Sequence, residues 1–145
     1  KETNGNILFN YIPNQYNDAK TIYDLCLNET RSKIHLEIFG KSLREFLALT
    51  FNCTALIGNE GGATNMAKAL NKPTFTIFAP WINKDAWNMF DDEKTNVSVH
   101  LKDFKPELYS NNAIFKKLKS KAEDYYKEFS ISLFEEELIR FLNQF

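Results

Sequence analysis

Short apolar runs alternate with amphipathic stretches along most of the chain. The apolar runs, closed by glycine, proline or asparagine, predict strands at residues 7–12, 34–39, 54–58, 74–79 and 97–101. Between the first four of these strands, apolar residues at helical spacing predict helices at residues 16–29, 42–50 and 63–70. This alternation, with a period of about twenty residues, predicts an α/β fold: a Rossmann-like parallel sheet with right-handed crossovers and flanking helices.

Two serine–glutamate pairs at capping-box spacing predict where helices begin. Ser42 with Glu45 opens the helix after the second strand, and Ser132 with Glu135 opens the last helix of the chain. Asn71, just before a proline, marks the end of the third helix. One further helical face, ahead of the last helix, is formed by Ile114, Leu118, Ala122 and Tyr125.

The chain has 145 residues, and we expect one domain with a sheet core over about residues 1–105 and two helices over residues 106–145. A net charge of −1 without a basic stripe argues against nucleic-acid binding. No apolar run approaches the roughly 18 residues of a membrane span, and the start is no signal peptide. Cys26 and Cys53 lie in apolar surroundings, which favours free thiols in a reducing compartment over a disulfide. A strand follows the first residues at once, which suggests a piece of a longer protein.

The segment from Gly58 to Thr64, which we call the glycine loop (residues 58–64), joins the third strand to the third helix. Ligands of parallel sheets bind beyond the carboxyl ends of the strands. Gly61 and Gly62 allow a positive φ and let the backbone approach a ligand closely. The free amides at the start of the following helix point toward the same ligand position. The loop therefore suits a phosphate or pyrophosphate. Gly40, Lys41 and Ser42 form a second loop of this type.

A purely structural interpretation of the glycine loop stays open beside the functional one. A glycine pair after a strand also forms a tight turn, and it is neither a Walker loop nor a dinucleotide fingerprint. Glu60 suits a first-turn carboxylate at a helix start equally well. If a ligand is present, we expect Glu60 to take sugar or ribose hydroxyls, because like charges keep it from phosphate.

The order of residues around the glycine loop resembles the second half of glycosyltransferase family 9, the ADP-heptose:lipopolysaccharide heptosyltransferases. The resemblance covers roughly residues 7–90. The matching positions are Gly40, Ser42, Leu43, Asn59, Glu60, Gly61, Gly62, Asn65, Met66, Ala67, Ala69, Leu70, Pro73, Phe78 and Pro80.

The resemblance implies the C-terminal, donor-binding half of a GT-B glycosyltransferase. Catalysis in that family is inverting and metal-independent, so no cofactor or metal is expected, and this sequence has no Asp-x-Asp motif. The catalytic base, an aspartate, belongs to the N-terminal domain, which this chain lacks, so we expect no catalytic residue here and no turnover by the chain alone. The expected donor-binding residues are Ser42, Leu43, Asn59, Glu60, Gly61, Gly62, Ala63, Asn65 and Lys84.

Three positions of the glycine loop and its helix depart from the family pattern. The family's aspartate is Glu60, its serine or threonine is Gly61, and its histidine is Asn65. Asn65 donates hydrogen bonds but carries no charge, and charge-assisted bonds are roughly twice as strong as neutral ones. Lys84 or an arginine of the N-terminal domain would restore the charge. An enzyme with another donor or acceptor is as consistent with these residues as one that uses ADP-heptose.

Several other residues have a structural and a functional interpretation. Trp81 and Trp87 would either stack on a base or sugar of the ligand, or pack against the protein and fix the loop that carries them. We interpret His35 and His100 as structural, and the acidic run at residues 91–93 as a solvated turn. The simplest interpretation of the lysines at 116, 117, 119 and 121 is a solvent-exposed helix face, and the alternative is a surface that docks to anionic lipid headgroups.

The sequence predicts a nucleotide-sugar-binding domain of a heptosyltransferase-like enzyme that makes lipopolysaccharide or another bacterial surface glycan. Its partners would be the nucleotide-sugar donor and, through the N-terminal domain, a lipid-linked or glycan acceptor. Such an enzyme would work in the cytoplasm, peripherally at the inner membrane. The rival hypothesis is a non-catalytic Rossmann-like module, either a degenerate transferase half or a protein-interaction domain.

Overall fold

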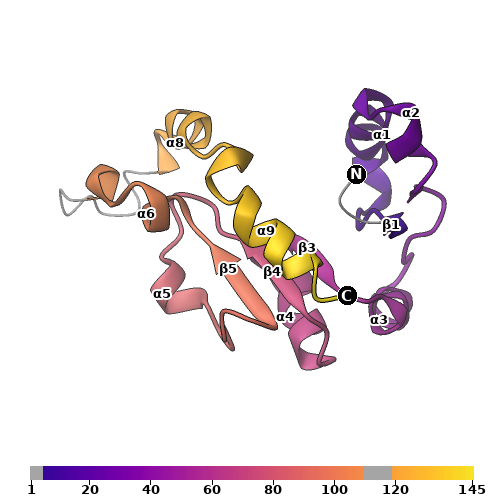
Figure 1. Cartoon of the computed structure of the whole chain (residues 1–145). Coiled ribbons are helices and arrows are strands. Elements are labelled where there is room, and N and C mark those ends of the chain that lie inside the picture. Colours follow the sequence, from indigo (N-terminus) through magenta and orange to yellow (C-terminus); the bar gives the residue numbers. More distant parts are fainter. Residues whose placement is uncertain (1–4, 110–118) are drawn as a thin grey trace. The chain divides into compact units, whose positions relative to one another are not determined.

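The computed structural model describes residues 5–109 and 119–145 of the chain (Figure 1). Its contacts divide the chain into two compact units, residues 1–53 and residues 54–145. The five predicted strands exist, but they lie in two parallel sheets, β1-β2 and β3-β4-β5, where the pattern predicts one continuous sheet. The α/β class, with parallel strands flanked by helices, is confirmed.

Over its described residues, 5–53, the first unit holds a two-stranded parallel sheet and three α-helices. Its elements are β1 (Ile7–Leu8), η1 (Pro13–Gln15), α1 (Tyr16–Leu25), α2 (Asn28–Arg31), β2 (Ile34–His35) and α3 (Leu43–Asn52). Ile7 pairs with Ile34 and Leu8 with His35. Both strands are shorter than predicted. In β2 the chain turns after His35, where the Ile38 amide donates to the His35 carbonyl at 3.4 Å.

Tyr11 is central to the core of the first unit. It is buried together with Ala19, Ile34 and Leu36. Its hydroxyl donates to the Leu36 carbonyl at 2.6 Å, and its ring stacks on Phe39 at 4.8 Å between centroids. The buried hydroxyl is thus satisfied while the ring contributes apolar area.

The second unit contains a three-stranded parallel sheet followed by short helices. Its elements are β3 (Leu56–Asn59), α4 (Gly62–Ala69), β4 (Thr74–Ile77), α5 (Lys84–Trp87), β5 (Asn96–Val99), α6 (Leu101–Phe104), η2 (Pro106–Tyr109), α8 (Ala122–Glu128), η3 (Ile131–Leu133) and α9 (Glu135–Leu142). The strands are in register, so that Asn59, Ile77 and Val99 lie side by side at the carboxyl ends.

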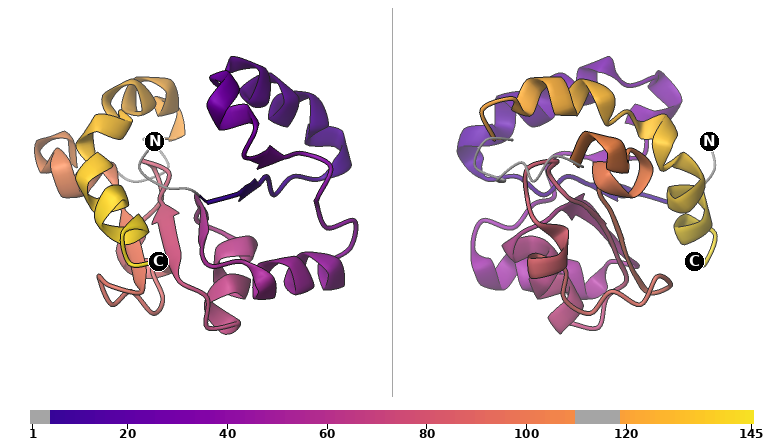
Figure 2. Two further views of the ribbon diagram at one scale, coloured as in Figure 1. Left: turned by 45° about the vertical axis from the view of Figure 1, so that its right-hand side comes forward. Right: turned by 90° about the vertical axis from the view of Figure 1, so that its left-hand side faces the viewer.

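Both faces of this sheet are covered, with α4 and α9 on opposite sides of the strands (Figure 2). Phe75 of β4 and Val99 of β5 pack with Phe134 and Phe141 in an aromatic-rich core, and the Phe75 and Phe141 rings lie 5.6 Å apart. Thr74 and Thr76 alternate with Phe75 along β4 and are also buried. β4 is buried at every position except the half-buried Ile77, so both of its faces are covered although threonine alternates with apolar residues along it.

One of the two predicted capping boxes begins a helix and the other does not. Ser42 caps α3, because its hydroxyl accepts the Glu45 amide at 3.3 Å, while the Glu45 carboxylate accepts the Lys41 amide. The prediction at Ser132 is wrong: Ser132 lies in η3, its hydroxyl pairs with that of Ser130, and α9 begins at Glu135. Burial of Phe134 at the N-cap overrides the local signal.

Other predicted features of the chain have mixed outcomes. Asn71 has a φ of 55° just after α4, as predicted for a helix end, and Cys26 and Cys53 are free. Ile114 and Leu118 lie outside the described residues, as do the lysines at 116 and 117. Within residues 5–109 and 119–145, none of the helices has the length and apolar character needed to cross a bilayer.

Candidate functional site

The glycine loop leaves the carboxyl end of β3, as predicted. β3 ends at Asn59 and α4 begins at Gly62, so only Glu60 and Gly61 connect them. Since Asn59 pairs with Ile77 at the end of β4, the loop lies beside the segment that leaves β4. Both segments therefore lie at the edge of the sheet where parallel α/β proteins bind ligands.

Gly61 has a backbone conformation that requires glycine. Its φ of 148° with a ψ of −165° belongs to a region that residues with a side chain avoid. A Cβ at Gly61 would meet no described atom within 4 Å, and one at Gly62 would only touch the Met66 methyl at 3.8 Å. The glycines are therefore not forced by crowding, and the loop presents an open backbone surface.

The first turn of α4 presents amide groups that the helix itself does not use. The first intrahelical bond is donated by Asn65 to the Gly61 carbonyl at 3.1 Å, so the amides of Gly62, Ala63 and Thr64 precede it. No described side chain caps this end. Three parallel donors at the positive end of a helix dipole form a site for an anion.

Thr64 is a residue of this loop that the sequence analysis missed. It is buried, and its hydroxyl donates to the Asn59 carbonyl at 2.7 Å. This bond ties the start of α4 to the end of β3 and holds the amides in place. The sequence feature that could have indicated this role is a small hydroxyl residue two positions after a glycine pair.

Glu60 is anchored to the neighbouring strand rather than to its own helix. Its carboxylate Oε2 accepts the Ala79 amide at 3.0 Å, and its own amide donates to the Ile77 carbonyl at 3.3 Å. The second carboxylate oxygen has no hydrogen-bond donor among the described residues. Glu60 thus combines a fixed position with an oxygen that remains able to accept a hydrogen bond.

The segment whose Ala79 amide holds Glu60 also carries one ring of an aromatic pair. The ring of Trp81, which follows β4, meets the ring of Tyr126 on α8 edge to face, with centroids 5.2 Å apart and planes at 88°. Burial raises the pKa of the Tyr126 hydroxyl, and the negative charge of Glu60 raises it further. Trp81 therefore packs on protein, whereas Trp87 is 67% exposed.

Comparison with known proteins assigns the family. The family description glycosyltransferase family 9 (heptosyltransferase) matches residues 2–117. The chain belongs to glycosyltransferase family 9. Searches of curated proteins and of solved structures gave no match. The resemblance inferred from the glycine loop is thereby confirmed, and Tyr126 lies outside the matched residues.

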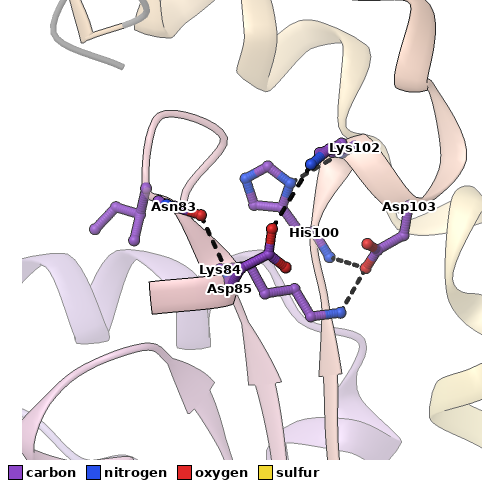
Figure 3. Close-up of a pocket in the computed structure, with 7 residues that line it drawn as sticks. Asn83, Lys84, Asp85, His100, Lys102 and Asp103 are labelled. Atoms are coloured by element: carbon purple, nitrogen blue, oxygen red, sulfur yellow. Dashed lines mark hydrogen bonds and ion pairs between the residues drawn. The ribbon is translucent and has the colours of Figure 1, made fainter. Parts of the chain in front are cut away.

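Lys84 of this family 9 chain is held by partners within the second unit. It lines a pocket of about 120 Å³ between α5 and the start of α6 (Figure 3). Its ammonium donates to the Asp103 carboxylate at 2.7 Å and to the Ser98 carbonyl at 3.0 Å. Because this ion pair already neutralises the charge of Lys84, a role for this lysine in donor binding stays a prediction.

His100 has a structural role, as predicted. It is buried, its Nδ1 accepts the Lys102 amide at 3.0 Å, and its own amide donates to the Asp103 carboxylate at 2.9 Å. Burial lowers the pKa of His100 more than Asp103 raises it, so the ring is neutral near pH 7. His35 bonds the Asn6 side chain in the first unit.

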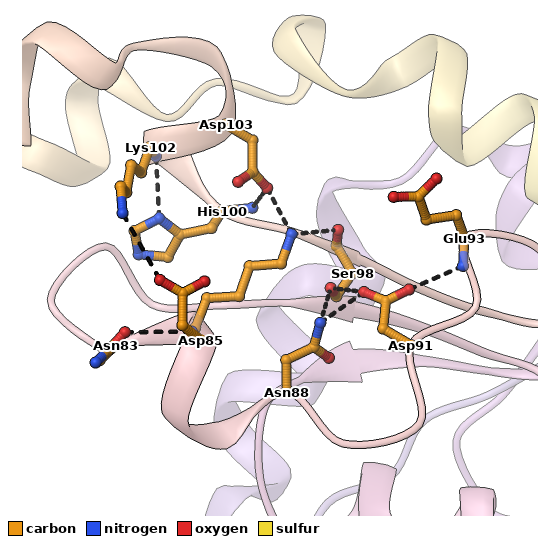
Figure 4. A network of polar contacts seen from close by, with 10 residues as sticks. Asn83, Asp85, Asn88, Asp91, Glu93, Ser98, His100, Lys102 and Asp103 are labelled. Carbon is orange, nitrogen blue, oxygen red and sulfur yellow. Dashed lines mark hydrogen bonds and ion pairs between the residues drawn. The ribbon is translucent and has the colours of Figure 1, made fainter.

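The acidic run at residues 91–93 is more ordered than the predicted solvated turn. Asp91 accepts hydrogen bonds from Ser98, Asn88 and the Glu93 amide (Figure 4). Asp92 accepts the backbone amides of residues 94–96. These carboxylates therefore organise the turn into β5, and Asp92 and Glu93 are exposed to solvent as predicted.

Ser42 and Leu43 belong to the first unit, apart from the other predicted site residues. Ser42 caps α3 and Leu43 is 61% exposed. A Cβ at Gly40, just before them, would lie 2.5 Å from the Phe46 nitrogen, so close backbone approach requires this glycine. The part of Ser42 and Leu43 in donor binding stays a prediction.

Among the residues that the structure describes, no three His, Cys, Asp or Glu side chains are grouped to hold a metal ion. The second unit instead brings together the amides of α4, the Glu60 carboxylate and the aromatic pair. Asn59 and Asn65 flank these groups with exposed side chains. This arrangement can bind a phosphate through backbone donors and a hydroxyl through Glu60.

Proposed function

We propose that this chain binds the nucleotide-sugar donor of a glycosyltransferase that builds lipopolysaccharide or another bacterial surface glycan. The observation that carries the proposal is the start of α4. Its three unused amides lie beside an anchored carboxylate at the carboxyl edge of the sheet, in a chain of glycosyltransferase family 9. A diphosphate joined to a sugar needs both kinds of group within a short distance.

Each part of the loop has a role in this proposal. The amides of Gly61, Gly62 and Ala63 bind the diphosphate of the donor as the sequence predicts, and the unused amide of Thr64 follows them in the first turn of α4. Glu60 accepts hydroxyl groups, since a carboxylate beside a phosphate would repel it. Asn65, on the next turn of α4, donates its side-chain amide to the phosphate or sugar. Asn59 lines the base of the loop, and Ser42, Leu43 and Lys84 complete the predicted set.

The reaction requires groups beyond these residues. We propose an inverting transfer without a metal, in which an aspartate of the family's N-terminal domain acts as the base and that domain binds the lipid-linked or glycan acceptor. The chain alone then binds donor without turnover. Since both substrates of such a transfer lie at the inner membrane, the proposal places the enzyme on its cytoplasmic side.

The experiment is a calorimetric titration of the chain with ADP, UDP, GDP and CMP. The test variant is Gly62→Val, whose branched side chain would block access to the free amides of α4. The fold has room for the added Cβ, which would touch only the Met66 methyl. The matched control is Gly58→Ala in β3, where a Cβ meets only the Leu56 side chain at 3.5 Å. Saturable binding of one nucleotide by the wild type and the control, lost in Gly62→Val, is the expected result.

The second candidate is a non-catalytic Rossmann-like module. The pairing of Lys84 with Asp103 favours it, because this pair removes the cation expected to replace the family's histidine. If the folded wild-type chain binds none of the nucleotides, the donor-binding proposal is contradicted and the module is favoured. Equal binding by Gly62→Val and wild type would instead place the nucleotide elsewhere on the chain.

A further inference from the structure

Trp81, for which the sequence analysis left both ligand stacking and loop packing open, forms an aromatic corner with Tyr126, a residue that the sequence analysis did not place in the site. They come from different elements, the segment after β4 and helix α8, and meet at 88° with centroids 5.2 Å apart. Tyr126 remains 49% exposed, and its hydroxyl has no hydrogen-bond partner among the described residues. A half-exposed tyrosine ring that packs edge to face with a tryptophan offers an ordered apolar surface together with a polar group.

The corner is connected to the glycine loop through one short segment. Ala79, whose amide holds the Glu60 carboxylate at 3.0 Å, lies two positions before Trp81. Because Trp81 contacts Tyr126, the same segment links Glu60 to both aromatic rings. Residues 79–81 therefore connect the anchored Glu60 carboxylate, which directly precedes the start of α4, to an aromatic pair that carries a tyrosine hydroxyl.

We propose that Trp81, Tyr126 and Glu60 bind the pyranose ring of the donor's transferred sugar, a proposal that rests on the donor-binding function above. A pyranose has faces of C–H groups that pack on aromatic rings and a rim of hydroxyls that donate to a carboxylate. Glu60 adjoins Gly61, so the ring that it binds is one attached directly to the diphosphate. The transferred sugar and the ribose are both attached directly to the diphosphate. A nucleobase is not, so Glu60 would not bind it.

The test compares nucleoside diphosphates with their sugar conjugates on the same protein. The probes are ADP and UDP against ADP-glucose, ADP-heptose, UDP-glucose and UDP-N-acetylglucosamine, measured by calorimetry. The variants are Trp81→Leu, Tyr126→Leu and Tyr126→Phe. Trp87→Leu is the matched control, because Trp87 is the other tryptophan and is 67% exposed.

The expected result is selective for the sugar. Trp81→Leu and Tyr126→Leu weaken binding of the preferred sugar conjugate by about five- to tenfold, the size of one lost aromatic contact, and leave the diphosphate unchanged. Tyr126→Phe keeps most of the affinity. A direct readout comes from a Trp87→Phe protein, in which the emission of Trp81 changes with the sugar conjugate and not with the diphosphate.

Three results would overturn the inference, and only one of them also removes the donor-binding function. If diphosphates bind but the sugar adds no affinity and no change in Trp81 emission, the sugar lies elsewhere. If the leucine variants weaken diphosphates and conjugates equally, the corner binds ribose or base. If the folded wild type binds neither class, both proposals fail. The emission measurement needs neither leucine variant, so it decides even where those variants misfold.

Discussion

Replacing Asp91 by asparagine tests whether a charged hydrogen-bond network holds the turn into β5. The Asp91 carboxylate accepts the Ser98 hydroxyl, the Asn88 side-chain amide at 2.6 Å and the Glu93 amide at 3.0 Å (Figure 4). Asparagine has nearly the same size but turns one acceptor into a donor that faces other donors. The change therefore removes charge and hydrogen bonds without making a cavity.

The size of the effect follows from these contacts. Hydrogen bonds to a charged acceptor contribute about 1.5–3 kcal/mol each, and water replaces part of this at a half-buried site. We expect Asp91→Asn to lower the free energy of unfolding by about 2 kcal/mol at pH 7.

The effect depends on pH in a direction set by the pKa of Asp91. Burial acts to raise this pKa, but the hydrogen bonds and the charge of Lys84 outweigh it and hold the pKa below its ordinary value of 3.8. A carboxylate with a depressed pKa stabilises the fold fully above the ordinary value, and this stabilisation is lost as the pH falls through the folded-state pKa. The difference between wild type and Asp91→Asn should thus shrink below about pH 4.

The assay is urea unfolding followed by circular dichroism at pH 7 and at pH 3. Asp124→Asn is the control, because the Asp124 side chain is 75% exposed and its ion pair with Lys127 spans 3.8 Å. We expect it to change the unfolding free energy by less than about 0.5 kcal/mol. Equal stability of Asp91→Asn and wild type at pH 7, or a difference that does not vary with pH, would refute the reasoning.

Three further predictions concern the backbone and the buried histidine. Gly61→Ala forces alanine to a φ of 148° and should cost about 1–3 kcal/mol in thermal unfolding, against less than about 1 kcal/mol for Gly58→Ala. Ser42→Ala removes the cap of α3 and should cost about 0.5–2 kcal/mol in urea unfolding, whereas Ser132→Ala should cost less than about 0.5 kcal/mol, and equal losses would contradict the assignment. Because the pKa of His100 is lowered, the unfolded state binds more protons just below pH 6.5, so stability should fall as the pH drops from 7 to 5. His100→Asn keeps a side-chain acceptor for the cap of α6 but removes the titrating ring, so the unfolding free energy measured in urea should vary less between pH 7 and pH 5. If the pH dependence is unchanged, another group causes it.

Features set by nearby residues could be predicted from the sequence. The glycine loop, the Ser42 cap and the left-handed Asn71 depend on turn chemistry within a few positions, and the structure places each as predicted. The order of strands and helices along the chain could also be predicted, because each strand is a short stretch rich in apolar and β-branched residues between turn residues. Local signals were sufficient wherever no distant contact competed with them.

Features set by distant contacts could not be predicted. The serine–glutamate spacing at Ser132 has the same form as the one at Ser42, but burial of Phe134 moves the start of α9. The pairing of Lys84 with Asp103 joins separate elements, and nothing in the sequence pattern indicates it. Tyr126 reaches Trp81 from a helix far along the chain, so only the fold brings it into the candidate site.

The departure from the family pattern at position 61 affects the backbone as well as the side chain. The pattern has serine or threonine there, and neither adopts a φ of 148° with a ψ of −165° without strain. Gly61 therefore gives the loop a conformation that the usual residue would resist, in addition to removing a hydroxyl. Because Asn65 is uncharged and Lys84 is already paired, we expect the phosphate contacts of the proposed donor site to come mainly from the backbone amides of α4. The φ and ψ of Gly61 set the direction of those amides, so in the proposed donor site the absent side chain and the glycine backbone conformation at position 61 would act together on the phosphate.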